Sequence, residues 1–297
     1  MENLDDDRLI QGMAWSGDFR IIAAKTTSSL NAARLGRDLS PVASAALGRA
    51  MTGAVLLARL LDKQVKQQHV TLRFDGKGPL GVVIAEGTFN GTMRGYVTNP
   101  AVEDTAVDVG AGVGNRGLMT VTRKTPPLGK AYASQVELVS GEIAKDIVHF
   151  LATSEQIASA VMLGVLTNRQ GVAAAGGMIV QAFPHASLKA IEAMEDKIRQ
   201  APSFSSLLEK MPLEEAVQEV LRGADYKAID ASFNTPLAFQ CSCTRERALA
   251  SFQYFSRQEL GDMIEREGGS EATCQFCGQK YTFSGEDLLA LSSLPDA

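Results

Sequence analysis

The chain has 297 residues, of which 45% are hydrophobic and 21% are charged, and its formal net charge at neutral pH is −5. This length is enough for one substantial hydrophobic core and a smaller unit beside it. The mildly acidic balance does not favour nucleic acid or an anionic membrane surface as a partner.

The first elements predict a strand and a long helix. Residues 19–24 are typical of a strand, and a serine and a proline at 40–41 are typical of a helix start. The helix that follows, 42–61, is rich in alanine and leucine, like a membrane span. Arg49 and Arg59 argue against spanning, because each charge would cost about 3 kcal/mol near the bilayer centre. We therefore expect a buried core helix.

The next stretch changes to a period of two residues. Apolar and polar side chains alternate over 70–74, and a glycine-rich turn follows at 76–79. Residues 82–85 and 92–97 continue as strands around a second turn at 89–91. This pattern predicts an antiparallel meander.

Glycines at 110–117 match the pattern of a dinucleotide-binding loop, G-x-G-x-x-G. In such a site the loop follows a strand and opens a helix whose N-terminus faces the pyrophosphate. Here the following residues, 118–122, predict a strand. We therefore interpret the glycines as a hairpin or loop connection.

The chain then predicts two helices and a returning strand. Residues 140–151 have the pattern of an amphipathic helix, and residues 154–156 are typical of the cap of another helix that would run to about 168. Residues 173–181 predict a strand, and Pro184 after it marks a domain edge.

Beyond this edge the composition shifts to charged helices. Ser187 caps the first, whose apolar stripe is Leu188, Ile191, Met194 and Ile198. Pro212 begins the second, whose apolar residues are Leu213, Val217, Val220 and Leu221. Because each helix has a single apolar face, both must dock on another surface to be stable.

All four cysteines lie in the last fifth of the chain, as the pairs Cys241 with Cys243 and Cys274 with Cys277. A C-x-C on an extended segment places both side chains on one face, and a C-x-x-C turn brings two sulfurs within about 4 Å of each other. Gly278 allows the positive φ of such a turn. Four thiolates fill the tetrahedral shell of zinc, so we predict one structural or regulatory zinc ion per chain.

Other interpretations of the cysteines are disulfides, buried free thiols and a thioredoxin-like redox motif. Resting disulfides need an oxidising compartment, whereas residues 1–7 are acidic and lack the basic start and apolar core of a secretory signal. A thioredoxin-like motif lies between a strand and a helix, whereas residues 278–283 alternate like a strand. The spacing favours a shared zinc site.

The charge of the cysteine region argues against a zinc module that binds nucleic acid. Residues 237–297 contain five basic and nine acidic side chains, a net charge of −4, and a zinc ion with its four thiolates makes this balance more negative. A module of this size has little core, so zinc would supply on the order of 10 kcal/mol of its folding free energy. Arg245 and Arg247 would keep the nearby thiols deprotonated, so that oxidation would eject the metal and unfold the module.

Several motifs along the chain point to one family. In the cysteine region they are Phe239-x-Cys241-x-Cys243-x-x-Glu246-Arg247, Cys274-x-Phe276-Cys277-Gly278 and Tyr281-x-Phe283. Upstream they are Ser140-Gly-Glu142-Ile, Ser154-Glu155-Gln156 and Gly176-Gly177-Met-Ile-Val-Gln181. These motifs resemble the heat-shock protein 33 family of bacterial redox-regulated chaperones. The resemblance covers most of the chain, and residues 185–236 match in character more than in motif.

Together with the predicted elements, the resemblance implies an α+β fold in three parts. We expect a core domain of mostly antiparallel sheet packed with helices at 1–184. A helical linker would follow at 185–236, and a small zinc-binding α+β domain at 237–297.

The resemblance also implies a cytoplasmic, ATP-independent holdase that is inactive while its reduced cysteines bind zinc. In that family, peroxide or hypochlorous acid with heat forms two disulfides, releases the metal and loosens the linker. The chaperone then dimerises and holds unfolding client proteins, with neither nucleic acid nor a membrane as a partner. Helices at 188–200 and 212–222 are the expected client-binding surface.

Four cysteines allow three disulfide connectivities. We predict the local pairs, Cys241 with Cys243 and Cys274 with Cys277. Once zinc no longer holds the distant pairs together, closing the shortest loops costs the least entropy.

Two other functions stay open. A zinc-ribbon adaptor for protein partners would keep its metal and its function when oxidised, and a thiol-disulfide oxidoreductase would turn over small disulfides without zinc. Neither explains why the large core has no cysteine. The sequence also has no nucleophile elbow, P-loop or HExxH motif, so we expect no enzymatic activity.

Overall fold

The computed structural model describes residues 6–61, 68–102, 108–124, 131–229 and 234–292. Contacts divide the chain into two compact units, one of residues 1–34 and 38–240 and the other of residues 35–37 and 241–297. The predicted linker therefore belongs to the same compact unit as the core. The three-part division of the chain stays a prediction.

The first sheet of the larger unit is built from both ends of that unit. Its order in the described residues is β10-β1-β2-β9-β8, and β11 also pairs with β1. The strands are β1 Arg8–Ala14, β2 Phe19–Lys25, β8 Ser159–Asn168, β9 Gly171–Ala182, β10 Lys227–Ala228 and β11 Thr235–Pro236. All these pairings are antiparallel. The strands predicted at 19–24 and 173–181 are confirmed as β2 and β9.

The second sheet contains the predicted meander. Its order is β12-β5-β4-β3-β6-β7. The strands are β3 His69–Asp75, β4 Val82–Thr88, β5 Thr92–Val97, β6 Leu118–Lys124, β7 Ala131–Glu137 and β12 Ala238–Phe239. The antiparallel pairs β3–β4 and β4–β5 confirm the meander. Alternate residues of these three strands are buried, so one face of the sheet packs on the core.

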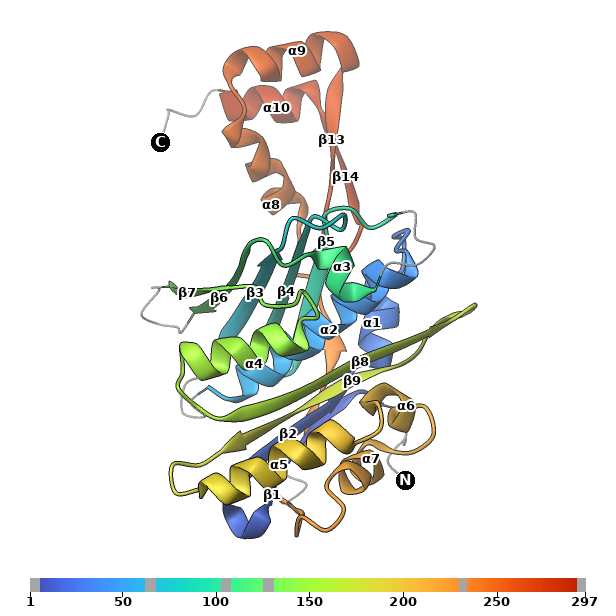
Figure 1. Ribbon diagram of the computed structural model, residues 1–297. Coiled ribbons are helices and arrows are strands. Elements are labelled where there is room, and N and C mark those ends of the chain that lie inside the picture. Colours follow the sequence, from blue (N-terminus) through green and yellow to red (C-terminus); the bar gives the residue numbers. More distant parts are fainter. Residues whose placement is uncertain (1–5, 62–67, 103–107, 125–130, 230–233, 293–297) are drawn as a thin grey trace. The chain divides into compact units, whose positions relative to one another are not determined.

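Helix α2, Pro41–Arg59, lies between the two sheets (Figure 1). The Ser40 side chain caps it by accepting a hydrogen bond from the first turn. Among the described residues, α2 is the helix long and apolar enough to cross a membrane, but 83% of its most apolar window is buried inside the unit. The prediction of a buried core helix is confirmed. A Cβ atom on Gly87 of β4 would lie 2.4 Å from the Val55 amide nitrogen, so only glycine allows this approach of sheet and helix.

Three more helices lie on the far face of the first sheet, in the segment predicted as a linker (Figure 1). They are α5 Leu188–Gln200, α6 Phe204–Leu208 and α7 Leu213–Val220. The buried side chains of the larger unit therefore form two clusters, one around α2 and one between the first sheet and α5–α7. The mixed α+β fold of helices packed on antiparallel sheets is as predicted.

The helix predicted to run from 154–156 to about 168 is wrong, because this segment is strand β8. Val161, Leu163 and Val165 pack on the cluster around α2, whereas Ala160 and Met162 pack on the cluster under α5–α7. A strand that is covered on both faces reads as a continuous apolar run with no period of two. Such a run cannot be told from a buried helix by periodicity alone.

The apolar stripe predicted for the first linker helix is wrong at its first position. Met194 is fully buried, and Ile191 and Ile198 pack beside it, but Leu188 is 79% exposed. At 3.6 residues per turn, Leu188 lies about 90° away from the centre of the other three. It therefore points off the docked face.

The glycines at 110–117 do not form a nucleotide loop. Helix α3, Val109–Val113, contains the first of these glycines, and the residues after it connect to β6. A loop connection was therefore the correct interpretation, apart from this short helix. The Gly78 amide donates to the Val113 carbonyl oxygen at 2.9 Å, and the Arg116 amide donates to the Gly76 carbonyl oxygen at 3.1 Å. The glycines thus let two backbone loops pack directly on each other.

The helix predicted at 140–151 is α4, Ala144–Thr153.

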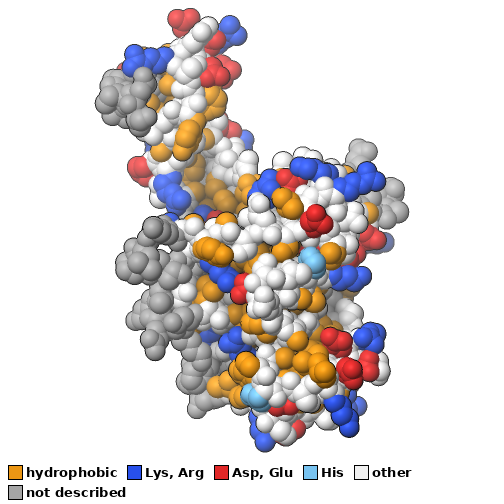
Figure 2. Space-filling view, turned by 60° about the vertical axis from the view of Figure 1, so that its left-hand side comes forward, with side chains coloured by type: hydrophobic (Ala, Val, Ile, Leu, Met, Phe, Trp, Pro, Cys, Tyr) orange, Lys and Arg blue, Asp and Glu red, His pale blue; other side chains and the backbone are white. Residues whose placement is uncertain are grey.

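The surface of the larger unit carries few large apolar side chains. Among its described residues, those exposed are Leu118, Tyr132, Val139 and Leu188. Figure 2 likewise shows apolar side chains in small groups among charged ones. Scattered apolar residues of this kind are ordinary on a protein surface.

Candidate metal centre

The smaller unit has a small apolar core. Its elements are α8 Arg245–Ala250, a 3-10 turn Ser251–Tyr254, α9 Arg257–Glu267, β13 Gly269–Thr273, β14 Lys280–Ser284 and α10 Gly285–Ser292. Strands β13 and β14 form an antiparallel hairpin. The buried apolar cluster in the described residues is Phe252, Leu260, Phe283 and Leu288. Four buried side chains with seven partly buried ones around them are still a small core for an independent fold, which favours a contribution from a bound metal.

The first cysteine pair lies on the segment just before α8. The Thr244 side chain caps this helix by accepting a hydrogen bond from the Arg247 amide at 3.2 Å. The Arg247 guanidinium in turn donates to the carbonyl oxygen and the hydroxyl of Ser242, at 2.8 and 2.9 Å. The residue between Cys241 and Cys243 is thereby tied to the start of the helix.

The second pair lies in the turn of the β13–β14 hairpin. The Gly278 amide donates to the Cys274 carbonyl oxygen at 2.8 Å, and the Cys274 amide donates to the Gln279 carbonyl oxygen at 2.9 Å. Gly278 has φ +74°, as the sequence predicts for this position. The turn therefore holds Cys274 and Cys277 on one side of the hairpin end.

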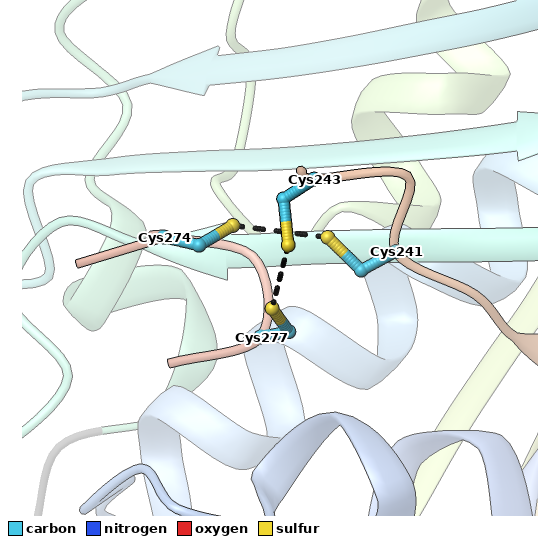
Figure 3. Close-up of side chains that lie close together, drawn as sticks. All are labelled: Cys241, Cys243, Cys274 and Cys277. Carbon is cyan, nitrogen blue, oxygen red and sulfur yellow. Dashed lines mark hydrogen bonds between the residues drawn. The ribbon is translucent and has the colours of Figure 1, made fainter. Parts of the chain in front are cut away.

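The four sulfurs converge on one point (Figure 3). The Sγ atoms lie 3.7 Å apart in Cys241 and Cys274 and 3.4 Å apart in Cys243 and Cys277. All four lie within 4.8 Å of one another, and each cysteine is partly buried with a free thiol. Zinc–sulfur bonds of about 2.3 Å in a tetrahedron place the sulfurs about 3.8 Å apart. The residues present therefore fit a zinc ion.

Tyr281 is a further part of the site. Its hydroxyl donates a hydrogen bond to Cys243 Sγ at 3.2 Å, and this bond lowers the pKa of Cys243 to about 7. Burial raises the pKa of Cys277 to about 12 and also raises the pKa of Cys241. Burial disfavours the charged thiolate form of these cysteines. A divalent cation between the sulfurs would stabilise the thiolates and so lower the pKa values of its ligands.

Arg245 and Arg247 have partners other than the thiols, and their predicted effect on thiol deprotonation stays a prediction. Arg245 pairs with Asp287 at 2.8 Å and lies over the Phe283 ring, 4.5 Å from its centre. Arg247 holds Ser242. Both guanidinium groups thus organise the backbone and the core, and the hydrogen bond from Tyr281 is the largest of the effects that lower the pKa of Cys243.

The spacing of the motif Tyr281-x-Phe283 also indicates where the Tyr281 side chain lies. Tyr281 and Phe283 are two residues apart on β14, so their side chains share one face. Phe283 is 1% exposed in the small core, so Tyr281 faces the same way at the cysteine end of the strand.

Comparisons with known proteins agree with this architecture. A family model described as "Hsp33 protein" matches residues 7–284. The chain is 43% identical over 296 residues to a 33 kDa chaperonin of Thermus thermophilus, covering 96% of this chain and 86% of that protein. It is 36% identical to the 33 kDa chaperonin of a Geobacillus species, covering 98% and 99%.

A solved structure is also similar. It is the crystal structure of a 33 kDa chaperonin, a heat shock protein 33 homologue from Thermotoga maritima, with a TM-score of 0.86 and 32% identity. The match covers 96% of this chain and 97% of that one. All these relatives are named as chaperonins and none as an enzyme, in line with the expectation of no enzymatic activity.

Proposed function

The chain belongs to the Hsp33 family of chaperones, and from this premise we propose that it is an ATP-independent holdase that oxidation of its four cysteines activates. The observation that carries the proposal is the convergence of all four thiols within 4.8 Å of one another. A site with four sulfur ligands has no open position for a substrate or an activated water. It suits a metal that holds a fold together.

In the reduced state, Cys241, Cys243, Cys274 and Cys277 would hold one zinc ion per chain. Structural zinc sites contribute on the order of 10 kcal/mol of folding free energy. Because the described part of the smaller unit has only a small buried apolar cluster, we propose that it unfolds when the metal leaves. The chain would then be active in the cytoplasm, as a dimer that binds unfolding clients.

We expect the oxidised protein to contain the local disulfides Cys241–Cys243 and Cys274–Cys277. In the folded site the nearest sulfurs instead belong to different segments, Cys241 with Cys274 and Cys243 with Cys277. We therefore expect local pairing to follow separation of the two segments, after which the shortest loops close most readily. Peptide mapping of peroxide-treated protein checks this. A bond from Cys241 to Cys274 or Cys277 would contradict it and would show that oxidation occurs within the folded site.

Tyr281→Phe is expected to weaken zinc binding by about 10- to 100-fold, the usual effect of removing a hydrogen bond to a metal ligand. The change removes the hydroxyl that donates to Cys243 and leaves the ring. Competition with a chromogenic chelator measures the affinity. Tyr254→Phe is the matched control, because Tyr254 is in the same unit and 93% exposed. Equal affinities of the two variants would remove Tyr281 from the site.

The decisive experiment measures zinc content and suppression of client aggregation before and after peroxide with mild heat. We expect one zinc ion and little activity before treatment, and no zinc and full activity after it. A zinc-ribbon adaptor would keep its metal and its binding partner under oxidation. A thiol-disulfide oxidoreductase would reduce small disulfides catalytically without zinc. Either result would replace the proposal.

A further inference from the structure

Residues 234–240, which we call the strap, run along an edge strand of each sheet in the larger unit. The part named β11 pairs with β1, through Leu9 with Thr235. The part named β12 pairs in parallel with β5, through Thr92 with Ala238 and Met93 with Phe239. The next residue in the chain is Cys241. The strap therefore connects the edges of the core directly to the first predicted zinc ligand.

The contacts of the strap are those of a strand added to the edge of a sheet. The amides of Ala238 and Gln240 donate to the carbonyl oxygens of Gly91 and Met93, at 3.1 and 3.0 Å. The Leu237 side chain is 7% exposed and belongs to the cluster around α2, and Phe239 packs partly buried on the same cluster. Main-chain bonds with alternate side chains in apolar pockets are the contacts by which sheet edges bind extended peptides.

The strap pairs with only a short part of the β5 edge. It pairs with β5 over two residues, whereas β3 and β4 pair over seven. It fits closely at one point, since a Cβ atom on Gly91 would lie 2.3 Å from the Pro236 carbonyl oxygen. Residues 234–240 include no charged side chain. Pairing over so few residues is weak enough for unfolding of the chain beyond Cys241 to release the segment.

We propose that the edge of β5 is a docking site for clients, which the strap occupies until the metal is lost. This inference rests on the proposed function. The occupant that fits is an extended, uncharged segment of an unfolding protein, with large apolar side chains at alternate positions. It adds to β5 as a strand and takes the pockets of Leu237 and Phe239. The strap thus occupies the place of a client within the reduced protein.

Labelled peptides with the sequence of residues 234–240 test this edge by fluorescence anisotropy. The unmodified peptide is expected to bind the oxidised full-length protein, not to bind the reduced zinc form, and to compete with a client. N-methylation at the Ala238 and Gln240 positions removes two donors and is expected to weaken binding about tenfold or more. N-methylation at the Phe239 position is the control, because successive amides of a strand point in opposite directions.

Equal binding of the two methylated peptides would overturn the edge proposal. So would failure of the unmodified peptide to bind an oxidised protein that still holds clients, a result that leaves the proposed function standing. An oxidised protein that holds no client would remove the proposed function itself. If peptide binding falls as the protein concentration rises, a second copy of the protein competes with the peptide. The edge would then bind the strap of another copy, which would contradict our proposal.

A substitution in the protein tests the strap from the other side. Gly91→Ala places a Cβ atom against any segment that lies on this edge, so the oxidised protein is expected to bind the unmodified peptide severalfold more weakly. Gly17→Ala is the control, because Gly17 has φ +98° against +93° at Gly91 but only an ordinary contact with Met13, at 3.5 Å. Unchanged peptide binding by oxidised Gly91→Ala protein would contradict the proposal, and so would an equal loss in Gly17→Ala.

Discussion

Replacing the four cysteines by serine is expected to abolish zinc binding, to unfold residues 241–292 and to raise holdase activity severalfold without any oxidant. Serine has nearly the shape of cysteine but is a poor zinc ligand, so the change removes the metal with little effect on packing. The lost binding free energy is on the order of 10 kcal/mol, which matches the whole stability of a typical domain. The apolar cluster around Phe252 and Phe283 is too small to replace it.

Three measurements on one sample check this prediction: zinc content, hydrogen exchange along the chain and suppression of client aggregation. Chelation of zinc from the unchanged protein is the matched control, because it removes the metal without any substitution. Substitution and chelation are expected to unfold the same residues. Added zinc is expected to refold the chelated protein but not the substituted one. A variant whose cysteine unit is unfolded but which stays inactive at every temperature would show that the metal does not control activity.

Met194→Glu is expected to raise holdase activity without oxidant while the zinc ion stays bound. Met194 is fully buried between α5 and the first sheet. A charged carboxylate at this place would be buried without water or a partner, which costs several kcal/mol of folding free energy. Undocking of the helix exposes the carboxylate to water and removes this cost. Val217→Glu acts in the same way on α7, where Val217 is also fully buried.

The structure supplies the control for this experiment. Leu188 belongs to the same helix but is 79% exposed, so Leu188→Glu is expected to leave activity and stability nearly unchanged. Hydrogen exchange should show rapid exchange in α5–α7 and continued protection of β3 and β4, with one zinc ion retained. Equal activity of the Met194 and Leu188 variants would refute the role of docking. So would an active protein whose linker is as protected as its core.

The two clusters of the larger unit explain how such opening leaves the rest folded. The cluster under α5–α7 lies on the far face of the first sheet, whereas the cluster around α2 lies between the two sheets. Ile21 belongs to the outer cluster, and its neighbour Ile22 belongs to the inner one. Because successive side chains of a strand point to opposite faces, helices can leave the outer face without opening the inner cluster.

Elements with one buried face were predictable from the sequence. Residues 70–74 alternate between core and solvent, so their period of two was visible, and the structure confirms β3. The helix at 42–61 was predictable from its cap at Ser40, and its two arginines argued against a membrane span. Local signals of this kind do not depend on the rest of the fold.

The sequence by itself determined which side chains can form a metal site, since the chain has four cysteines and their spacing suits one tetrahedral ion. Only the tertiary structure decided that β8 is a strand, because both of its faces are covered and its apolar run has no period. It also decided that Tyr281 contacts Cys243 and that Leu188 faces solvent. Spacing along one segment is a local property of the chain, whereas burial and partners depend on which distant segments pack against it.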